Sequence, residues 1–224
     1  MPLGNSKARV VILGAGGHGS EIQAYILELL KGGWDGQFLG FLDDAVPKGR
    51  HRNLEVLGTL EELASRPASF LKDMMYLTAV GDNAARRRIV ERATSLCAGE
   101  VKPWTLLHPS AFVGEAVEIG EGTLLAPGTL VTSRVKIGRH CILNVKASVS
   151  HDCEVGDYVS LNPGVTVCGR CRIGDGAYLG AGATVINGME IGARAIVGAG
   201  AVVVRDIPPD VTAVGAPARI IKTH

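Results

Sequence analysis

From Val113 to Val203, every sixth residue of the chain is aliphatic, without exception. A spacing of six matches neither the 3.6-residue period of an α-helix nor the two-residue alternation of a strand. It is typical of a hexapeptide β-solenoid, in which three short strands make one coil of about 18 residues. The stretch between these two residues therefore predicts about five stacked coils.

The six-residue period also predicts which cysteines lie inside the solenoid. Cys141, Cys153 and Cys171 each stand two residues before one of the periodic aliphatics, a position that small side chains occupy elsewhere in the repeat. We therefore expect them inside the solenoid as free thiols, with Cys153 and Cys171 stacked in successive coils. Cys168 and Cys171 form a C-x-x-C pair, but no second pair is present, which disfavours a zinc site.

The first half of the chain follows a different pattern, in which short apolar runs alternate with helical segments. The runs at 9–13, 38–42 and 75–80 predict strands, and the segments that begin near residues 17, 60 and 84 predict helices. Thr59-Leu60-Glu61-Glu62 has the spacing of a capping box at the start of the second helix. This alternation predicts a parallel α/β sheet, half of a Rossmann-like fold, over residues 1–105. The solenoid then occupies 106–224, and the residues after Ile207-Pro208-Pro209 should cap its last coil.

Composition narrows the functional classes. The chain has 23 Lys and Arg against 22 Asp and Glu, so net charge gives it no reason to bind nucleic acid or an anionic membrane. Glycine contributes 30 of 224 residues and aromatics only 4%, as a narrow core of small aliphatics requires. No apolar run approaches the roughly 20 residues of a membrane span, and the polar start of the chain does not resemble a signal peptide. We expect a cytoplasmic protein.

A glycine-rich loop follows the first expected strand. Gly14-x-Gly16-x-x-Gly19 opens a helix, where backbone N–H groups favour a phosphate, and Asp43 or Asp44 ends the next strand. An NAD enzyme is the obvious interpretation, but the first half has room for only half of a dinucleotide fold. A mononucleotide or nucleotide sugar fits better, and the remaining alternative is that these glycines serve only the turn.

His151 is the polar anomaly of the solenoid. It stands two residues after Val149, at an outward corner, and the residue stacked above it is Gly169. A histidine beside the carboxylate of Asp152 and an uncovered backbone N–H can perform acyl transfer, with the histidine as base and the N–H as oxyanion donor. The alternative is a solvated corner histidine, which is what we expect of His140. A zinc site of three histidines is disfavoured because the solenoid repeat contains only these two.

Six motifs in this order resemble the sialic acid O-acetyltransferase and nucleotide-amino-sugar N-acetyltransferase family. They are Gly14-Ala-Gly-Gly-His-Gly19, Phe41-Leu-Asp-Asp44, Ala79-Val-Gly-Asp-Asn83, Leu107-His-Pro-Ser110, Val149-Ser-His-Asp-Cys153 and Val214-Gly-Ala-Pro-Ala-Arg219. The resemblance implies a left-handed parallel β-helix, a homotrimer, and acetyl-CoA bound in the cleft between neighbouring subunits.

The resemblance also implies roles for individual residues. His151 would be the general base, Asp152 would orient it and raise its basicity, and the Gly169 backbone would hold the thioester oxygen. Asn144 would line the acceptor pocket. The nucleotide sugar would be held by Gly16, Gly17, His18, Asp43, Asp44 and Gly81, and acetyl-CoA by Ala181, Ala199 and Ser160. Some family members carry a histidine that contacts CoA at the position of Ser160, so the resemblance does not establish a cosubstrate contact for Ser160.

We therefore expect an acetyl-CoA-dependent N-acetyltransferase that acts on a nucleotide-activated amino sugar, without a metal. O-acetylation of a sugar such as sialic acid would use the same base and is the rival within this class. A non-catalytic solenoid that assembles partners and an NAD oxidoreductase are the alternatives of other classes. The His151–Asp152 pair argues against the assembly protein, and the glycine loop favours a nucleotide-bearing acceptor.

Overall fold

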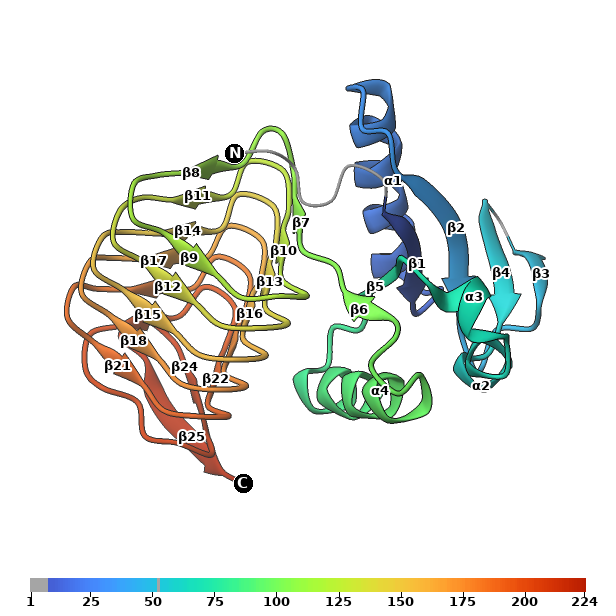
Figure 1. Cartoon of the computed structure of the whole chain (residues 1–224). Helices are drawn as coiled ribbons and strands as arrows, with labels where there is room; N and C mark the ends of the chain where they lie inside the picture. The colour runs from blue at the N-terminus through green and yellow to red at the C-terminus, as the bar shows by residue number, and fades with distance from the viewer. Residues whose placement is uncertain (1–7, 52) are drawn as a thin grey trace. The chain divides into compact units, whose positions relative to one another are not determined.

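The computed structural model describes residues 8–51 and 53–224 and comprises two compact units, Met1–Leu106 and Leu107–His224 (Figure 1). The start of the chain, residues 1–7, which the sequence suggests is not a signal peptide, lies outside the described residues. Among the helices of the described part, none is both long and apolar enough to cross a membrane.

The first unit is a six-stranded sheet in the order β3-β4-β2-β1-β5-β6, with helices between the strands. Its elements are β1 (Arg9–Leu13), α1 (Gly17–Lys31), β2 (Gln37–Leu42), β3 (Gly49–His51), β4 (Leu54–Gly58), α2 (Leu60–Ala64), α3 (Ala68–Leu71), β5 (Met74–Thr78), α4 (Asn83–Leu96) and β6 (Lys102–Pro103). The predicted strands and helices are all present. β3, β4, α3 and β6 were not predicted, because they are short segments without a sustained hydrophobic period.

Strand β1 lies at the point where the strand order reverses. It pairs in parallel with β2 on one side and with β5 on the other. The loops that leave the carboxyl ends of β1 and β5 therefore meet at one edge of the sheet. This topological switch point is where open α/β sheets bind their ligands.

Helix α1 packs through a narrow apolar face. Ile22, Ile26 and Leu29 are buried, whereas Leu30 is 36% exposed. The helix ends at Lys31, and Gly32 is its C-cap. The capping box at Thr59 is also confirmed, since its hydroxyl accepts from Glu62 N and the Glu62 carboxylate accepts from Thr59 N.

The second unit is a parallel β-helix with three faces (Figure 1). The first face contains β7 (Leu106–Leu107), β10 (Leu124–Leu125), β13 (Ile142–Leu143), β16 (Ser160–Leu161), β19 (Tyr178–Leu179) and β22 (Ile196–Val197). The second face contains β8 (Phe112–Val113), β11 (Leu130–Val131), β14 (Ser148–Val149), β17 (Thr166–Val167), β20 (Thr184–Val185) and β23 (Val202–Val203). The third face contains β9 (Glu118–Ile119), β12 (Lys136–Ile137), β15 (Glu154–Val155), β18 (Arg172–Ile173) and β21 (Glu190–Ile191).

The strand register confirms the predicted count in sixes and eighteens. Val131 pairs with Val149, and Leu143 pairs with Leu161. Every periodic aliphatic from Leu125 to Val203 is buried, while the two in the first coil are partly exposed. The inward cysteines are also confirmed: Cys141, Cys153 and Cys171 are fully buried free thiols.

The end of the chain continues the first face. Strand β24 (Val211–Val214) pairs in parallel with β22 of the last coil, and β25 (Arg219–Thr223) pairs antiparallel with β24. The residues after Ile207 thus cover the edge of the last coil on this face, as predicted.

Candidate active site

His151 and Asp152 lie in the turn 150–153, at the corner between the second and third faces. Nδ1 of His151 is 2.7 Å from Oδ2 of Asp152, and the two side chains are 43% and 37% exposed. An ionised carboxylate only accepts hydrogen bonds, so Nδ1 carries the proton and Nε2 keeps its lone pair. The imidazole is therefore an exposed group with one nitrogen available as a base.

Gly169 occupies the same position in the next coil. A Cβ built on Gly169 would stand 2.6 Å from Cε1 and 2.7 Å from Nε2 of His151, closer than such atoms approach. Only glycine leaves room for the imidazole here. The ring therefore lies directly against the Gly169 backbone, as the 18-residue spacing predicts.

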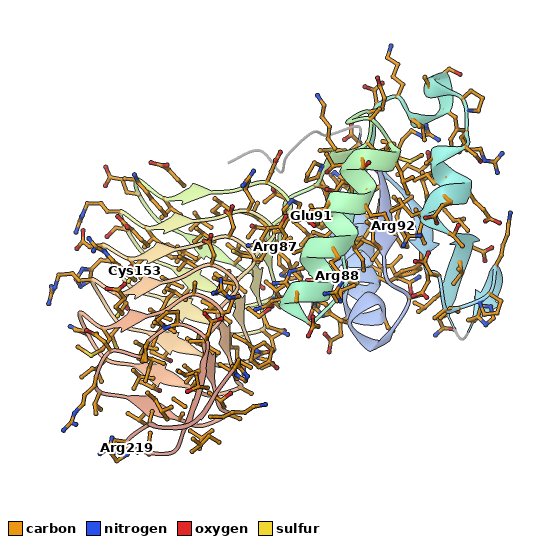
Figure 2. All side chains as sticks on the ribbon, turned by 90° about the horizontal axis from the view of Figure 1, so that it is seen from below. Arg87, Arg88, Glu91, Arg92, Cys153 and Arg219 are labelled. Atoms are coloured by element: carbon orange, nitrogen blue, oxygen red, sulfur yellow. The ribbon has the colours of Figure 1, made fainter. Side chains whose placement is uncertain are left out.

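The peptide group between Cys168 and Gly169 is held from inside the β-helix. Sγ of Cys153, a residue labelled in Figure 2, donates to the carbonyl oxygen of Cys168 at 3.1 Å. In a trans peptide the N–H points opposite to the carbonyl, so the Gly169 N–H faces outward. Within the described chain this N–H makes no hydrogen bond.

Arg134 completes the polar cluster from the preceding coil. Its Nε donates to Oδ1 of Asp152 at 2.6 Å, and its Nη2 donates to Oδ2 at 3.2 Å. The hydrogen bonds from Arg134 and then from His151 hold the pKa of Asp152 well below its ordinary value. Asp152 is therefore ionised at neutral pH. Arg134 was not predicted as part of the site, although it precedes Asp152 by 18 residues.

A cavity of about 290 Å³ adjoins this corner, and charges of both signs line it. Its lining residues are Asp152, Glu154, Arg170, Arg172, Gly188, Met189, Glu190 and Asp206.

The other residues that the resemblance assigns to the reaction lie at a different corner. Asn144, Ala181 and Ala199 belong to the turns between the first and second faces, and Oδ1 of Asn144 accepts from Val145 N at 2.7 Å. Both corners border the second face, on opposite edges. Ser160 is only 3% exposed, so the structure offers little of this side chain to a cosubstrate.

His140 is not the solvated residue that the sequence suggested. It is only 4% exposed, and its ring stacks on Tyr158 with centroids 5.2 Å apart. Gly122 leaves the space for this ring in the preceding coil, since a Cβ there would stand 2.2 Å from Nδ1 of His140. The prediction was wrong because the turn stacks side chains as well as backbone.

The glycines of the first unit divide into two groups. Gly14 has a φ of 110°, and a Cβ on Gly19 would lie 2.4 Å from the Gly14 carbonyl oxygen, so the turn itself requires these two. Gly16, Gly17 and Gly81 have no atom within 4 Å of the Cβ position. These three glycines leave open space at the amino end of α1 and in the loop after β5.

The start of α1 has the features of an anion site. The N-cap is Gly16, without a side-chain cap, and the first turn carries no acidic residue. Nδ1 of His18 is 3.1 Å from Glu21 Oε2, while its buried Nε2 lacks a hydrogen-bond partner among the described residues. The sequence left open whether His18 packs the loop or serves the site, and in this structure the protein covers its Nε2.

Asp43 and Asp44 both interact with other groups of the protein, Asp43 through hydrogen bonds and Asp44 through an ion pair. Asp43 accepts hydrogen bonds from the backbone N–H groups of Ala15, Ala45 and Val46 at 2.7–2.9 Å. Burial raises the pKa of Asp43, but these three hydrogen bonds outweigh it and lower the pKa overall. Asp43 thus ties the glycine loop to the end of β2, a role that the sequence did not reveal.

Two arginines of α4 were also not predicted from the sequence. Arg92 forms ion pairs with Asp44 and Glu61, and it lies on α4 with Arg88 and Glu91 (Figure 2).

Arg86 is fully buried, and it donates to Val80 O and Asn83 Oδ1, both at 2.9 Å. Arg86 therefore fixes the loop that contains Gly81. Its only sequence signal is a charged residue at an apolar helical position, one turn before Val90.

Parts of the chain match known protein families. Residues 9–93 match the PglD N-terminal domain, and residues 170–205 match the bacterial transferase hexapeptide repeat. UDP-N-acetylbacillosamine N-acetyltransferase of Bacillus subtilis (strain 168) is 40% identical over 113 residues, which span 50% of this chain and 49% of that protein. The match thus covers about half the length of this curated relative.

Two solved structures resemble the whole chain. The acetyltransferase domain of PglB from Neisseria gonorrhoeae FA1090 has a TM-score of 0.85 and 32% identity, covering 96% of this chain and 100% of that one. The chain belongs to the nucleotide-amino-sugar N-acetyltransferase family of hexapeptide-repeat proteins. A mutant of perosamine N-acetyltransferase from Caulobacter crescentus, in complex with CoA and GDP-perosamine, has a TM-score of 0.83 and 34% identity over 96% of this chain and 97% of that one.

Membership of this N-acetyltransferase family confirms the resemblance drawn from the six motifs. It also confirms the predicted combination of a Rossmann-like α/β domain and a hexapeptide β-helix. The PglB acetyltransferase domain is also known in complex with acetyl coenzyme A. Among the described residues, no group of three His, Cys, Asp or Glu side chains could hold a metal ion.

Proposed function

We propose that the chain transfers the acetyl group of acetyl-CoA to the amine of a nucleotide-linked amino sugar. The observation that carries the proposal is the corner of the β-helix where His151 touches both the Asp152 carboxylate and the Gly169 backbone. A base, its orienting carboxylate and an uncovered N–H are the groups that acyl transfer needs.

His151 acts as the general base through Nε2. Because Nδ1–H donates to Asp152, Nε2 accepts a proton from the amine as its nitrogen attacks the thioester carbonyl carbon. The C–S bond then breaks, the amide forms, and the proton leaves with the CoA thiol. The charge of Asp152 stabilises the imidazolium that exists between these two proton transfers.

Gly169 stabilises the oxygen of the thioester. Negative charge develops on the carbonyl oxygen during attack, and a fixed N–H donor lowers the energy of that state. The Gly169 N–H suits this role because it faces outward and has no partner within the described chain. The Cys153 thiol holds the other end of the same peptide group.

The first unit binds the nucleotide part of the acceptor. Gly16, Gly17 and Gly81 provide open space at the switch point of the sheet, and the uncapped start of α1 favours phosphate. His18 lies in the same loop, and its Nδ1 contacts the Glu21 carboxylate. Asp43 holds the loop in place, and Asp44 contributes through its ion pair with Arg92.

The active protein is a homotrimer that associates through the second face. The outward positions of that face carry no charge, and Phe112 and Leu130 are 56% and 47% exposed there. The outward positions of the third face are all charged and exposed: Glu118, Lys136, Glu154, Arg172 and Glu190. Around a threefold axis, one edge of each second face meets the opposite edge of its neighbour. This association would bring His151 of one subunit towards Asn144, Ala181 and Ala199 of the next.

The acetyl acceptor is an amine and not a hydroxyl. The relatives from Bacillus subtilis and Caulobacter crescentus are both named as N-acetyltransferases, which supports this choice over O-acetylation. We also infer a cytoplasmic location, in line with the free cysteines of the chain.

A panel of UDP-, GDP- and TDP-linked amino sugars tests the proposal through release of the CoA thiol. We expect release with at least one amino sugar and none with the matching hydroxyl sugar or with sialic acid. Acetyl-CoA and the accepted nucleotide sugar should each raise the melting temperature. Release with sialic acid alone, or a melting shift with NAD alone, would contradict the proposed function.

A further inference from the structure

Arg134, Asp152 and His151 form a continuous chain of hydrogen bonds across two coils of the β-helix. Oδ2 of Asp152 accepts from Nδ1 of His151 at 2.7 Å and from Nη2 of Arg134 at 3.2 Å, while Oδ1 accepts from Nε of Arg134 at 2.6 Å. Arg134 therefore donates hydrogen bonds to both oxygens of the carboxylate that binds the imidazole. It reaches His151 only through Asp152.

We propose that Arg134 is a positioning residue that fixes the Asp152 carboxylate and limits the negative charge that His151 senses. The inference rests on the proposed acetyl transfer, because it describes how the base of that reaction is tuned. A guanidinium that contacts both oxygens restrains a carboxylate more than a single hydrogen bond does. With Asp152 so restrained, the Nδ1–H bond holds the ring, and with it Nε2, beside Gly169.

The charge of Arg134 has an effect opposite to that of Asp152. A carboxylate beside an imidazole favours the protonated ring, and a neighbouring guanidinium offsets part of this influence. Arg134 thus allows Asp152 to orient the ring while it offsets part of the carboxylate charge beside that ring.

The other charged groups around His151 remain in place when Arg134 is replaced. In the next coil, the backbone N of Arg170 donates to His151 O at 2.9 Å. In the coil before Arg134, Glu115 O accepts a hydrogen bond from Arg134 N. Like the hydrogen bond to Asp152, the negative charge of Glu115 raises the pKa of Arg134. The cavity beside Asp152 adds Glu154, Arg172, Glu190 and Asp206. Because variants of Arg134 leave all these groups in place, a difference from the unaltered protein reports on Arg134 itself.

The chain offers a matched control at another corner. Arg194 donates from Nε to Oδ1 of Asp210 at 2.6 Å, the same atoms and distance as in the Arg134 pair. The Arg194 and Arg134 side chains are similarly exposed, at 67% and 63%. Arg194→Gln thus removes an equivalent ion pair that has no contact with His151.

The test compares Arg134→Gln, Arg134→Lys and Arg194→Gln in two measurements. The first is the pH profile of kcat/KM for acetyl transfer, and the second is the NMR titration of the His151 ring without substrates. In Arg134→Gln, the acidic limb of the kcat/KM profile and the midpoint of the His151 ring titration should both move to higher pH by about half a unit. Arg134→Lys keeps the positive charge and should restore both midpoints to those of the unaltered protein. Its kcat should still be lower, because an ammonium group cannot bind both carboxylate oxygens as a guanidinium does. Arg194→Gln should change neither.

Two outcomes separate this inference from the proposed function. An unshifted ring titration in Arg134→Gln, with an unchanged acidic limb, would overturn the role of Arg134 even if the enzyme is active. A shifted ring titration in a protein that acetylates no amino sugar would support the coupling and refute the proposed function.

Discussion

The imidazole of His151 lies against the backbone of Gly169, one coil further along the β-helix, with no room for a side chain between them. A Cβ on Gly169 would approach Cε1 of His151 to 2.6 Å. The base and its oxyanion donor are therefore fixed relative to each other by the stacking of coils, and this arrangement depends on the absence of one methyl group.

Gly169→Ala should displace the ring of His151 and reduce kcat by at least about tenfold, with a loss of stability of about 1–3 kcal/mol from overpacking. The φ of Gly169 is not in the left-handed region, so alanine adds a clash without backbone strain. A double-mutant cycle checks the cause, because Gly169→Ala should cost less stability when combined with His151→Ala. Equal costs in both backgrounds would mean that the methyl group meets something other than the imidazole.

Gly17→Ala and Gly19→Ala should have different effects, although both change a glycine of the same loop. The Cβ at 17 meets no atom within 4 Å, so this variant should melt normally while binding the nucleotide sugar more weakly. The Cβ at 19 meets the Gly14 carbonyl at 2.4 Å, so this variant should lose about 1–3 kcal/mol of stability. Melting curves with and without ligand measure both effects. Unchanged ligand affinity in Gly17→Ala would show that the open space is not used for binding.

The first unit should lose stability at acid pH through Asp43. The pKa of Asp43 is lower in the folded chain than its ordinary value of about 3.9. The ionised carboxylate therefore contributes its whole stabilisation of the folded unit at pH values above about 3.9. It is lost as the pH falls below about 4 and through the folded pKa, because protonation removes the carboxylate that accepts from Ala15 N. Unfolding of Asp43→Asn monitored between about pH 3 and pH 7 should show lower stability at neutral pH and a shallower decline. A parallel decline in both proteins would contradict this role of Asp43.

Leu161→Asp should destabilise the β-helix by about 4 kcal/mol or more, because Leu161 is fully buried and an unpaired carboxylate would replace it. The outward residue Lys136, exposed on the third face, provides the control, and Lys136→Ala should change stability by less than about 1 kcal/mol. Denaturant unfolding compares them. A similar stability for both variants would contradict the assignment of inward and outward positions.

The architecture of the second unit could be predicted from the sequence because its period is rigid. Each coil repeats the same strand pairing, so counting in eighteens places Gly169 above His151 without any other knowledge. The same count applied to Asp152 would have found Arg134. It failed for His140, because the period specifies the corner but not whether a neighbouring ring, here Tyr158, covers the side chain there.

The first unit was harder to predict in detail, because its contacts do not repeat. The sequence indicated the strands, the helices and the glycine loop. It held no sign that Asp43 binds the N–H of Ala15, 28 residues away. For Arg86 it held only a charged residue at an apolar helical position, and nothing that points to Val80 O as its partner. Such contacts depend on loop conformations that no hydrophobic pattern encodes.

The measurement that tests the central claim most directly is acetyl transfer by His151→Ala. With acetyl-CoA and an accepted nucleotide-linked amino sugar, the variant should lose at least about 100-fold in kcat, because general-base catalysis contributes a factor of that order. It should keep its melting temperature and its binding of acetyl-CoA, since the His151 side chain is 43% exposed. Turnover at the rate of the unaltered protein would contradict the account.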